Sequence, residues 1–543
     1  MMYALRIALI LLLSFCLVRC AVQTTPQGGP KDVDPPVLVK SFPKNKQTNF
    51  KGKIVELTFN EQVKLNNASE EIIITPSPGK VIDFNAKQNK ITIEPKENWK
   101  ENTTYSISFR EGVQDVTENN PADTLHLAFS TGPGIDSLTL YGRIRNGITE
   151  EIPQKVTVAI YQSDTTDILK HAAIYFTKTD KGGHFKIENL KSGKYFVYAF
   201  DDRNKNLKVE STTEKFGFKS EPIILEGKKI DSIIFAIAKA DSRPIKINSI
   251  RRTEKTTRVT FNKAIVHYKA ESNTTTQPIN SFGDTKSEII FFNPSTKSDS
   301  LKINLFARDS IDLSLDTTFY IKQSEIRAIK ENFKVNISEP IITLETGIFN
   351  LKAFFTKPIS KIDTDSIYIK IDSINIVRIE ENEIQTNNTE KTIHIEKKID
   401  KKLFSKEKIT PQLFIGKGFI ISYENDTSKI EGKPIKILSV EKTATLEIQI
   451  KTNQTNLITQ LLSESGTVIE SIKDLKNYTF KNLDPLTYRI RVIVDKNNNG
   501  QWDTTNIHTR TEAEPVYYYK SPEGNSAIKT RENSDIGPLI LTF

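Results

Sequence analysis

Short apolar runs broken by turn residues extend from Pro35 to the end of the chain, and this pattern restricts the fold more than any other feature. The runs are rich in Val, Ile, Phe, Tyr and Thr, and Asn, Gly, Asp or Pro interrupts them every ~8 to 12 residues. Apolar and polar positions alternate within the runs, which gives a strand one packed and one hydrated face, as in antiparallel β-sandwiches. Long helical periodicity is essentially absent, so the pattern predicts an all-β protein.

The length of the chain requires several folding units. With 543 residues it exceeds one hydrophobic core, and a prior of ~100 to 150 residues per domain predicts about four or five domains. Hydrophobic residues make up 37% and charged residues 26%, which is typical of folded chains. The two cysteines, Cys16 and Cys20, both lie in the first twenty residues. After removal of a leader, packing alone would stabilise the domains.

The N-terminal segment predicts export. An apolar run from Ile7 to Val18 follows an early positive charge. The run is shorter than the ~20 residues that span a bilayer and matches the apolar region of a signal peptide. No later segment of the sequence reaches membrane-spanning length without charges. Any membrane attachment is therefore expected at the N-terminus.

Cys20 stands where the apolar run ends, followed by the polar stretch CAVQTTPQGGPKDVDPP. This arrangement resembles the processing and acylation site of bacterial lipoproteins, although Arg19 stands where that family usually has Gly, Ala or Ser. The resemblance implies cleavage before Cys20, a diacylglycerol thioether on its sulfur and N-acylation, which together would anchor the chain. An ordinary signal peptide with two incidental cysteines is the alternative.

Internal repeats indicate where the domains lie. The string IVELTFNEQV at 54–63 recurs in altered form as TRVTFNKAI at 257–265 and LKAFFTKPI at 351–359. Each has a strand ending in Phe, then a small polar, a charged and an apolar residue, which predicts an inward aromatic ring followed by a bend at the sandwich rim. We interpret all three regions as Ig-like domains. The first resembles bacterial Ig-like modules of S-layer type, through DPPVLVKSFPKNKQTNF, VELTFNEQV, TYSISF and LAFSTGP.

A second repeat relates FKIENLKSGKYFVYAFDDRNKNLKVE at 185–210 to YTFKNLDPLTYRIRVIVDKNNNGQWD at 478–503, without gaps. Both copies resemble carboxypeptidase-regulatory or transthyretin-like sandwiches through the pattern F-x-φ-x-N-L-x-x-x-x-Y. The resemblance implies rigid accessory domains that stabilise, space or bind, without chemistry of their own.

The register of this second repeat extends further along the chain. Glu221-Pro222 follows Asp202 at the same distance as Glu514-Pro515 follows Asp495. We therefore expect the two Glu-Pro pairs to occupy equivalent places in a duplicated domain.

These repeats divide the chain into a leader, a tether and five domains, called the first to the fifth below. The predicted parts are a signal peptide (1–19), a lipidated tether (20–34), a bacterial Ig-like domain (35–133), a transthyretin-like domain (134–241), two Ig-like sandwiches (242–330 and 331–440) and a transthyretin-like domain with an Asp/Asn-rich loop (441–543).

The Asp/Asn-rich loop is the sharpest local motif. Oxygen-bearing side chains at alternate positions, with Gly at the sixth place to permit a sharp turn, match the first half of a calcium loop. Only two of these side chains are acidic and the twelfth position is Asn506, so weak binding is expected. An Asn-rich hairpin is the alternative, because Asn and Gly both tolerate positive φ. The candidate calcium ligands are Asp495, Asn497, Asn499, Gln501 and Asp503.

The earlier copy keeps oxygen ligands but loses the glycine, which is replaced by Leu207. Calcium is therefore less expected there. The corresponding oxygen-bearing residues are Asp202, Asn204, Asn206 and Glu210.

Other chemistry is not indicated. The six histidines are scattered without zinc-ligand spacing, and the mature chain shows no nucleophile elbow, phosphate-binding loop, dinucleotide fingerprint or cysteine nucleophile. Acidic pairs such as Asp201-Asp202 are typical of solvated turns. We predict no enzymatic activity; an envelope hydrolase would need several carboxylates with raised pKa values in one cleft.

The charge does not indicate a nucleic-acid partner. The formal net charge is +9 and falls to +7 (9 − 2) when Arg6 and Arg19 leave with the leader. Lys alternates with Glu and Asp along the strands, so no basic patch is visible.

Asp followed by Ser or Thr and then an apolar residue or Thr recurs along the chain, resembling the O-glycan acceptor triplet of exported Bacteroidetes proteins. The alternative is that such pairs open turns before strands. The examples are at Asp123, Asp136, Asp231, Asp299, Asp309, Asp365 and Asp372.

As a whole the chain resembles Ig-like-domain lipoproteins of Bacteroidetes-type bacteria. We expect an outer-membrane lipoprotein of the cell envelope, anchored through lipid at Cys20, that presents its sandwiches to an envelope protein partner. No cofactor is required, and calcium is the one candidate. The alternative is a lipoprotein that binds carbohydrate or peptide for uptake or adhesion, although the chain has only two tryptophans, Trp99 and Trp502, for sugar stacking.

Overall fold

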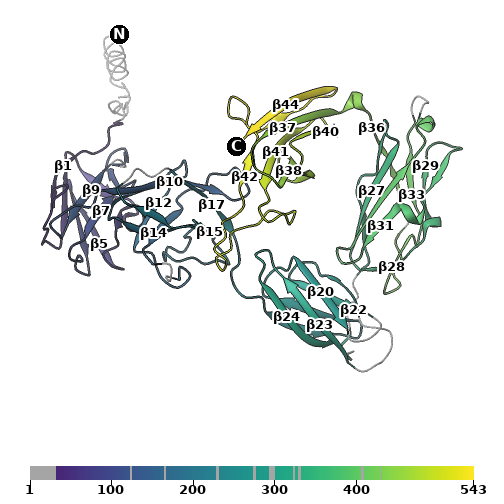
Figure 1. Cartoon of the computed structure of the whole chain (residues 1–543), viewed down its shortest axis with the longest axis horizontal. Helices are drawn as coiled ribbons and strands as arrows, with labels where there is room; N and C mark the ends of the chain where they lie inside the picture. Colours follow the sequence, from purple (N-terminus) through teal and green to yellow (C-terminus); the bar gives the residue numbers. More distant parts are fainter. Residues whose placement is uncertain are drawn as a thin grey trace, which may run out of the picture. The chain divides into compact units, whose positions relative to one another are not determined.

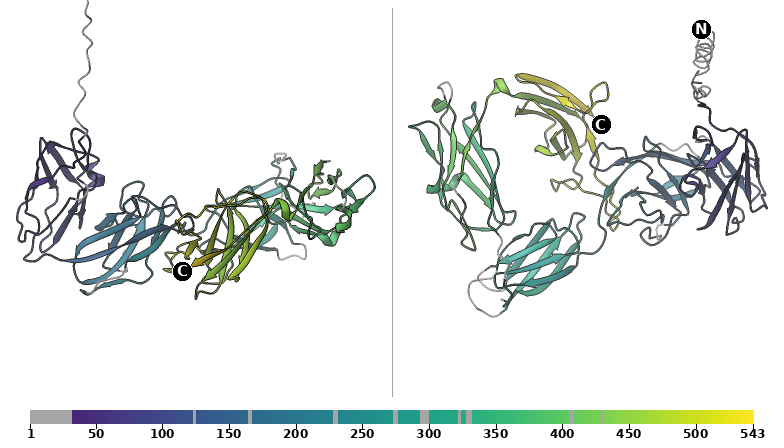
Figure 2. Two further views of the ribbon diagram at one scale, coloured as in Figure 1. Left: turned by 90° about the horizontal axis from the view of Figure 1, so that it is seen from above. Right: turned by 180° about the vertical axis from the view of Figure 1, so that it is seen from behind.

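Strands dominate the structure (Figures 1 and 2). The computed structural model describes residues 32–543 except 123–124, 164–166, 228–231, 273–276, 293–299, 322–323, 328–331, 405–408 and 430. The predicted signal peptide, Cys20 and most of the tether lie outside these ranges. None of the described helices is long and apolar enough to cross a membrane. The all-β prediction is confirmed. The helical elements described are α2 (Ala68–Glu71), η1 (Thr364–Ser366), η2 (Glu381–Glu383), η3 (Lys401–Phe404) and η4 (Val440–Lys442).

Packing divides the chain into two compact units. One runs to Thr139 and includes Ile174–Phe176 and Ile187–Lys191; the other contains the remaining residues up to Phe543. The predicted domain bounds fall near the connections between groups of strands, and the bounds themselves stay predictions. The candidate site described below lies within the second unit.

The first domain is built from short strands around an aromatic core. Strand β2 alternates buried and less buried positions, as its sequence predicts. Its inward side chains join a core in which the Trp99 ring meets Tyr105 and Phe129 edge-on. The sheet orders are β1-β2-β6-β5, β3-β8 and β4-β7-β9. The strands are β1 (Leu38–Phe42), β2 (Val55–Phe59), β3 (Val63–Leu65), β4 (Ile73–Thr75), β5 (Ile82–Lys87), β6 (Lys90–Pro95), β7 (Thr104–Ser108), β8 (Val113–Asp115) and β9 (His126–Ser130).

The second and fifth domains contain the two copies of the second sequence repeat. The strands of the second are β10 (Leu138–Asn146), β11 (Thr157–Tyr161), β12 (Tyr175–Lys178), β13 (His184–Leu190), β14 (Gly193–Phe200), β15 (Lys215–Phe218), β16 (Ile223–Leu225) and β17 (Ile233–Lys239). Those of the fifth are β37 (Ala444–Lys451), β38 (Leu457–Ser463), β39 (Val468–Lys473), β40 (Asn477–Leu483), β41 (Thr487–Val494), β42 (Val516–Tyr518), β43 (Ile528–Lys529) and β44 (Ser534–Thr542).

The two domains share one strand order. The order β13-β10-β17 corresponds to β40-β37-β44, and β12-β11-β14-β15 corresponds to β39-β38-β41-β42. The short strands β16 and β43 pair with β14 and β41, respectively. In the second domain β15 also pairs with β17, which joins these strands into one sheet, whereas the described strands of the fifth domain form two separate sheets. Two segments that align in sequence therefore have corresponding strand orders.

The first and last strands of both domains pair in parallel, β10 with β17 and β37 with β44. The sequence predicts only antiparallel pairs, because alternation gives the buried face of a strand and not its neighbour. At Gly142 an added Cβ would collide with the carbonyl group of Ile233 across the parallel pair. Glycine therefore permits the close approach of β10 and β17.

The third and fourth domains each consist of facing sheets. The third has the orders β18-β19-β22-β21 and β20-β23-β24, and the fourth has β31-β32-β27-β26-β36, with β25 on β27, opposite β30-β29-β33-β35 and the pair β28-β34. The strands are β18 (Ile247–Arg252), β19 (Thr256–Phe261), β20 (His267–Ser272), β21 (Ile279–Phe282), β22 (Glu288–Phe292), β23 (Leu301–Arg308), β24 (Ser314–Ile321), β25 (Val335–Ile337), β26 (Ile341–Thr343), β27 (Ile348–Phe355), β28 (Ile359–Ile362), β29 (Ile367–Lys370), β30 (Ile376–Arg378), β31 (Ile384–Asn387), β32 (Thr392–Lys398), β33 (Gln412–Ile415), β34 (Ile420–Ser422), β35 (Glu431–Pro434) and β36 (Lys436–Leu438).

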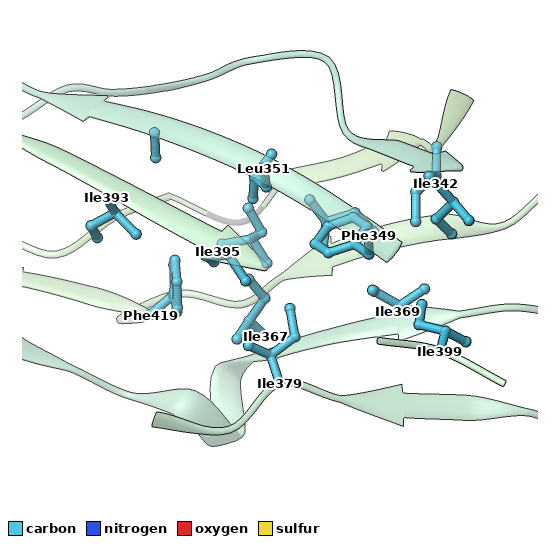
Figure 3. Close-up of a cluster of buried hydrophobic side chains, with 14 of the residues drawn as sticks. Ile342, Phe349, Leu351, Ile367, Ile369, Ile379, Ile393, Ile395, Ile399 and Phe419 are labelled. Atoms are coloured by element: carbon cyan, nitrogen blue, oxygen red, sulfur yellow. The ribbon is translucent and has the colours of Figure 1, made fainter. Parts of the chain in front are cut away.

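Figure 3 shows the core of the fourth domain. Phe349 and Leu351 of β27 and Ile395 of β32 lie on one side of this core, and Ile367 and Ile369 of β29 lie on the other. All five are essentially inaccessible to water. Burial of such aliphatic and aromatic side chains is the main source of stability in a chain without disulfides in its described part.

The three related strings end in the same way. Phe59, Phe261 and Phe355 are all buried where β2, β19 and β27 end, as the inward aromatic prediction requires. Two positions later the sequence has a charged residue, and Lys263 and Lys357 are buried at 8% and 4% exposure. Buried lysines at these positions were not expected from the sequence.

Each buried lysine has a carboxylate partner in its own domain. Lys263 pairs with Asp309, whose side chain is also buried. Lys357 Nζ lies 2.6 Å from both Glu424 and Asp426. A buried ammonium requires such partners, because an unpaired charge in a core is strongly disfavoured.

Candidate functional site in the Asp/Asn-rich loop of the fifth domain

The Asp/Asn-rich loop begins where β41 leaves the core. Asp495 directly follows this strand and is only 2% exposed. Its carboxylate oxygens accept hydrogen bonds from the backbone N–H groups of Asn499 (3.0 Å) and Gly500 (2.7 Å). Asn498 and Gly500 have φ of 57° and 80°, the left-handed region that Asn and Gly tolerate best. The chain can therefore turn back around a buried carboxylate.

The side chains of this turn close on Asp503. Nδ2 of Asn497 and Nδ2 of Asn499 donate to Oδ2 of Asp503 at 2.6 and 2.8 Å. The Oδ1 atoms of the two asparagines accept the N–H groups of Asn499 (3.2 Å) and Gln501 (2.8 Å). Four of the five predicted ligands thus lie together, whereas Gln501 is exposed.

The donor types fit calcium, which prefers carboxylate and amide oxygens. In this conformation, however, the amide N–H groups of Asn497 and Asn499 face Asp503. Each amide would have to rotate by a half-turn to direct its Oδ1 toward a calcium ion bound beside Asp503. Over the described ranges no group of three or more His, Cys, Asp and Glu side chains is arranged to hold a metal ion. Calcium binding stays a prediction, and the observed hydrogen bonds form the Asn-rich turn that is its alternative.

A further carboxylate, Glu514, belongs to this cluster. It is 3% exposed and accepts the backbone N–H groups of Lys496 (2.6 Å) and Asp503 (3.0 Å). Burial raises the pKa of Glu514, and repulsion from Asp503 and Asp495 adds to the shift. Burial likewise raises the pKa of Asp503. This role could not be predicted from the sequence, since nothing in a lone Glu-Pro pair shows where its carboxylate will point.

The loop after β14 in the second domain has the same hydrogen bonds. Asn204 and Asn206 donate to the Glu210 carboxylate at 2.7 and 2.5 Å. Glu214 accepts the backbone N–H groups of Arg203 and Glu210, both at 2.9 Å. Burial raises the pKa of Glu214, as it does for the corresponding carboxylate of the fifth domain. Hydrogen bonds within the protein therefore form this turn, although Leu207 stands where the fifth domain has Gly500.

These contacts make Glu214, and not Glu221, the counterpart of Glu514. The expectation that Glu221-Pro222 matches Glu514-Pro515 is therefore wrong: the two spacings agree by coincidence. The strand registers give the same correspondence, with Tyr198 opposite Phe218 and Phe200 opposite Phe216 in one domain, and Arg491 opposite Tyr518 and Ile493 opposite Val516 in the other.

The fifth domain therefore contains an insertion. Four positions separate Glu210 from Glu214 (214 − 210), but eleven separate Asp503 from Glu514 (514 − 503), so seven residues are extra. They lie in the segment Thr504–Glu512, which we call the strap. Within the strap, the backbones of Asn506 and Thr511 exchange two hydrogen bonds of 2.9 and 3.0 Å.

The strap contacts the second domain and the third domain, which begins at Ser242. The contacts are Thr504 Oγ1 to Lys239 O (3.2 Å), Asn506 Nδ2 to Ile311 O (2.7 Å), His508 Nε2 to Ser242 O (2.8 Å), Arg510 Nη1 to Tyr198 OH (3.1 Å) and Ser220 N to Glu512 Oε1 (3.0 Å).

Family comparisons match the first two domains. Residues 32–131 match the model of the bacterial Ig-like domain. The chain contains a bacterial Ig-like domain. Residues 150–245 match a family described as an uncharacterized protein conserved in bacteria. No curated protein is a significant match to the chain.

Several solved structures are similar to the chain at low identity. Native α2-macroglobulin of Escherichia coli, spanning domains MG0-NIE-MG1, is 9% identical with a TM-score of 0.18, over 49% of this chain and 97% of that one. SGBP-B of the Bacteroides ovatus mixed-linkage glucan utilization locus, in complex with a mixed-linkage heptasaccharide, is 9% identical with a TM-score of 0.15, over 64% and 84%. Dimeric latent PorU of Porphyromonas gingivalis is 10% identical with a TM-score of 0.22, over 67% of this chain and 46% of that one. Scores this low carry no argument about function.

Both tryptophans have structural positions. Trp99 is buried in the core of the Ig-like domain, where its Nε1 donates to the carbonyl of Lys53 at 2.8 Å. Trp502 donates from Nε1 to the carbonyl of Glu514 at 3.0 Å, and its ring packs against Gly147. Neither indole is a free platform for a sugar ring.

Two of the Asp-Ser pairs form turns before strands. Asp309 Oδ1 accepts the N–H groups of Ile311 and Leu313, and Asp372 Oδ1 accepts those of Ile374 and Asn375. This is the turn-opening role that was the alternative to glycan attachment. Glycosylation stays a prediction, and the pairs at 123, 231 and 299 involve residues outside the described ranges.

Proposed function

We propose that the chain is a non-catalytic protein of the bacterial cell envelope, anchored in the outer membrane through lipid at Cys20, that presents its sandwich domains to a protein partner. The observation that carries this proposal is the state of the carboxylates brought together in the fifth domain. Asp495 and Glu514 are buried and accept backbone N–H groups, rather than facing a cleft. Carboxylates used in this way hold a loop in shape, which favours a structural role over acid–base catalysis.

The anchor is tested by mass spectrometry of the protein extracted from envelopes, comparing wild type with Cys20→Ala. We expect the wild-type N-terminus to be Cys20 carrying acyl chains, and the variant to lose them and leave the membrane fraction. An unmodified N-terminus at another residue would refute the anchor, and the chain would then be better described as a freely secreted protein.

The partner is tested by cross-linking in intact envelopes, with wild type and Cys20→Ala compared at equal expression. We expect one envelope protein to be captured by the anchored form and lost when the anchor is lost. Capture of the same protein by both forms would show that binding is independent of the lipid. No reproducible protein partner would refute this part of the proposal.

A carbohydrate- or peptide-binding role is the second candidate, favoured by one cleft. Residues of β10 and of the region from β42 to Lys520 line a cavity of about 330 Å³, within the usual range for small-ligand sites. Arg143, Arg145 and Glu150 supply charge there, and Tyr517 and Tyr518 supply aromatic surface. The test is calorimetric titration with glycan fragments and short peptides, using Arg145→Ala and Tyr517→Ala. Heats that are absent, or unchanged in both variants, would exclude the cleft.

A further inference from the structure

The strap binds backbone groups at several points of the second compact unit. Side chains of Thr504, Asn506 and His508 reach the carbonyl oxygens of Lys239, Ile311 and Ser242, respectively, and the Asn506 side chain is itself buried in this contact. A backbone carbonyl away from water needs a hydrogen-bond donor. The strap therefore supplies hydrogen-bond donors to three carbonyl groups outside its own domain.

Two oppositely charged residues of the strap, Arg510 and Glu512, contact the second domain. The Arg510 guanidinium lies 5.1 Å from the Phe196 ring centre and 5.9 Å from that of Phe218, at cation–π distance. Glu512 lies 2.9 Å from Lys219 Nζ and accepts the N–H of Ser220. Burial acts to raise the pKa of Glu512, but the Ser220 and Lys219 hydrogen bonds outweigh it and hold that pKa below its usual value.

A second contact lies beside the strap. The Trp502 ring packs so closely on Gly147 that an added Cβ there would lie 2.9 Å from it. Arg491 Nη1 and Tyr518 OH both donate to the carbonyl of Ile148, at 3.2 and 2.7 Å. Gly147 therefore has no room for a side chain, because an added Cβ would lie 2.9 Å from both the Trp502 ring and the Ala238 Cβ.

The fifth domain does not depend on this contact for its core. The fifth domain has its own core, which includes Leu446, Phe480 and Ile490. The strap holds its own turn through the paired backbones of Asn506 and Thr511. Separation of the two domains would therefore break polar contacts and uncover the indole together with the Phe196 and Phe218 rings that lie under Arg510, while the core of the fifth domain is retained.

We propose that the strap is an intramolecular lock that holds the fifth domain on the second. While the strap is bound, both ends of the segment 242–440 are held, because this segment leaves the second domain at one end and enters the fifth at the other. When the strap dissociates, that segment is free to move while each sandwich stays folded. The corresponding loop of the second domain lacks the seven extra residues. The fifth domain alone therefore supplies the strap that makes this contact.

Trp502 reports the state of the lock. In a Trp99→Phe background it is the only tryptophan, so its fluorescence measures access to the surface beside Gly147. The test variant is Arg510→Ala/Glu512→Ala, and the matched control is Arg531→Ala/Glu532→Ala, an exposed Arg and Glu of the same domain. We expect a red shift of emission and an acrylamide quenching constant raised at least about twofold in the test variant alone, as for a locally opened region.

A second variant approaches the lock from the other domain. Gly147→Leu leaves the fifth domain untouched and places a side chain where the indole packs, so it should reproduce the red shift. Circular dichroism verifies that both domains remain folded in each variant. Unchanged quenching in both variants, with folded spectra, would overturn the proposal.

The wild-type chain provides an independent measurement in case the variants misfold. Hydrogen exchange of Ser220 and of Thr511 should be slowed together, because Ser220 N donates to Glu512 and Thr511 N donates within the strap. Exchange of Ser220 at the rate of an exposed amide would overturn the lock without any substitution.

Discussion

Replacing Lys357 by Met is predicted to destabilise the fourth domain strongly. The Lys357 side chain is 5% exposed, and its Nζ lies 2.6 Å from both Glu424 and Asp426. Burial acts to lower the pKa of Lys357, but its two carboxylate partners outweigh burial and raise it. Removing the ammonium leaves two carboxylates facing each other at a poorly hydrated site, although Met fills most of the space.

The magnitude follows from the exposure of the partners. Breaking a fully buried ion pair costs about 3–5 kcal/mol. Glu424 and Asp426 are 19% and 29% exposed, and Lys255 lies 3.9 Å from Glu424, so water and a second cation reduce the cost. We expect a loss near the lower limit of that range, about 3 kcal/mol.

Hydrogen exchange of β27 and β32 amides is the appropriate assay, because a multidomain chain has no single unfolding free energy. Lys352→Met, an exposed lysine of β27, should change protection by less than about 0.5 kcal/mol. Adding Glu424→Gln and Asp426→Asn to Lys357→Met should restore much of the loss, since no unpaired charge remains. Equal protection in wild type and Lys357→Met would refute the role given to this pair.

The pH dependence of this contribution has a defined sign. The folded-state pKa of Lys357 is raised above its ordinary 10.5. Its stabilisation is therefore complete below the unfolded-state pKa and is lost as pH rises through the folded-state pKa. The gap between wild type and Lys357→Met should persist at neutral pH and narrow only under strongly alkaline conditions.

The remaining predictions concern the second and fifth domains. If the Asp/Asn-rich loop binds calcium with a Kd of about 1 mM, 10 mM calcium should stabilise the fifth domain by about 1.4 kcal/mol in urea unfolding followed by Trp502 fluorescence, an effect absent with magnesium or in Asp503→Asn. Because the pKa values of Asp503 and Glu514 are raised above 3.8 and 4.5, stability from these groups should increase as pH falls from neutral toward those values, and falling stability over that window would contradict their burial. Gly142→Ala should destabilise the second domain and abolish protection of β10 and β17 amides, because its Cβ meets the Ile233 carbonyl, whereas an exposed substitution such as Lys186→Ala should not.

The sequence predicts the faces of strands better than their neighbours. Alternation identifies Val55, Leu57 and Phe59 as inward residues, and all three are buried. Alternation does not reveal that β10 and β17 pair in parallel, because the partner of a strand depends on contacts far away in sequence. The all-β class could therefore be predicted from the sequence, whereas the parallel pairing of β10 with β17 could not.

The same difference applies to the candidate site. The spacing of Asp495, Asn497 and Asn499 predicted a tight turn, and the turn is present. The contribution of Glu514 could not be predicted, because its carboxylate acts on backbone groups eleven and eighteen residues earlier in the chain. The burial of charged residues such as Lys357 cannot be predicted from their polarity for the same reason, because their partners are distant in sequence.

The insertion that forms the strap shows why a small change in sequence can create an interface. Lengthening the loop from four to eleven positions costs about 0.9 kcal/mol of closure entropy, since the cost grows only with the logarithm of length. A single net hydrogen bond contributes about 0.5–1.5 kcal/mol, so one or two of the strap contacts offset that cost. The two domains keep corresponding strand orders because the insertion lies outside their strands. A loop of seven extra residues can therefore give one of two alike sandwiches a specific contact with the other, while neither core has to change.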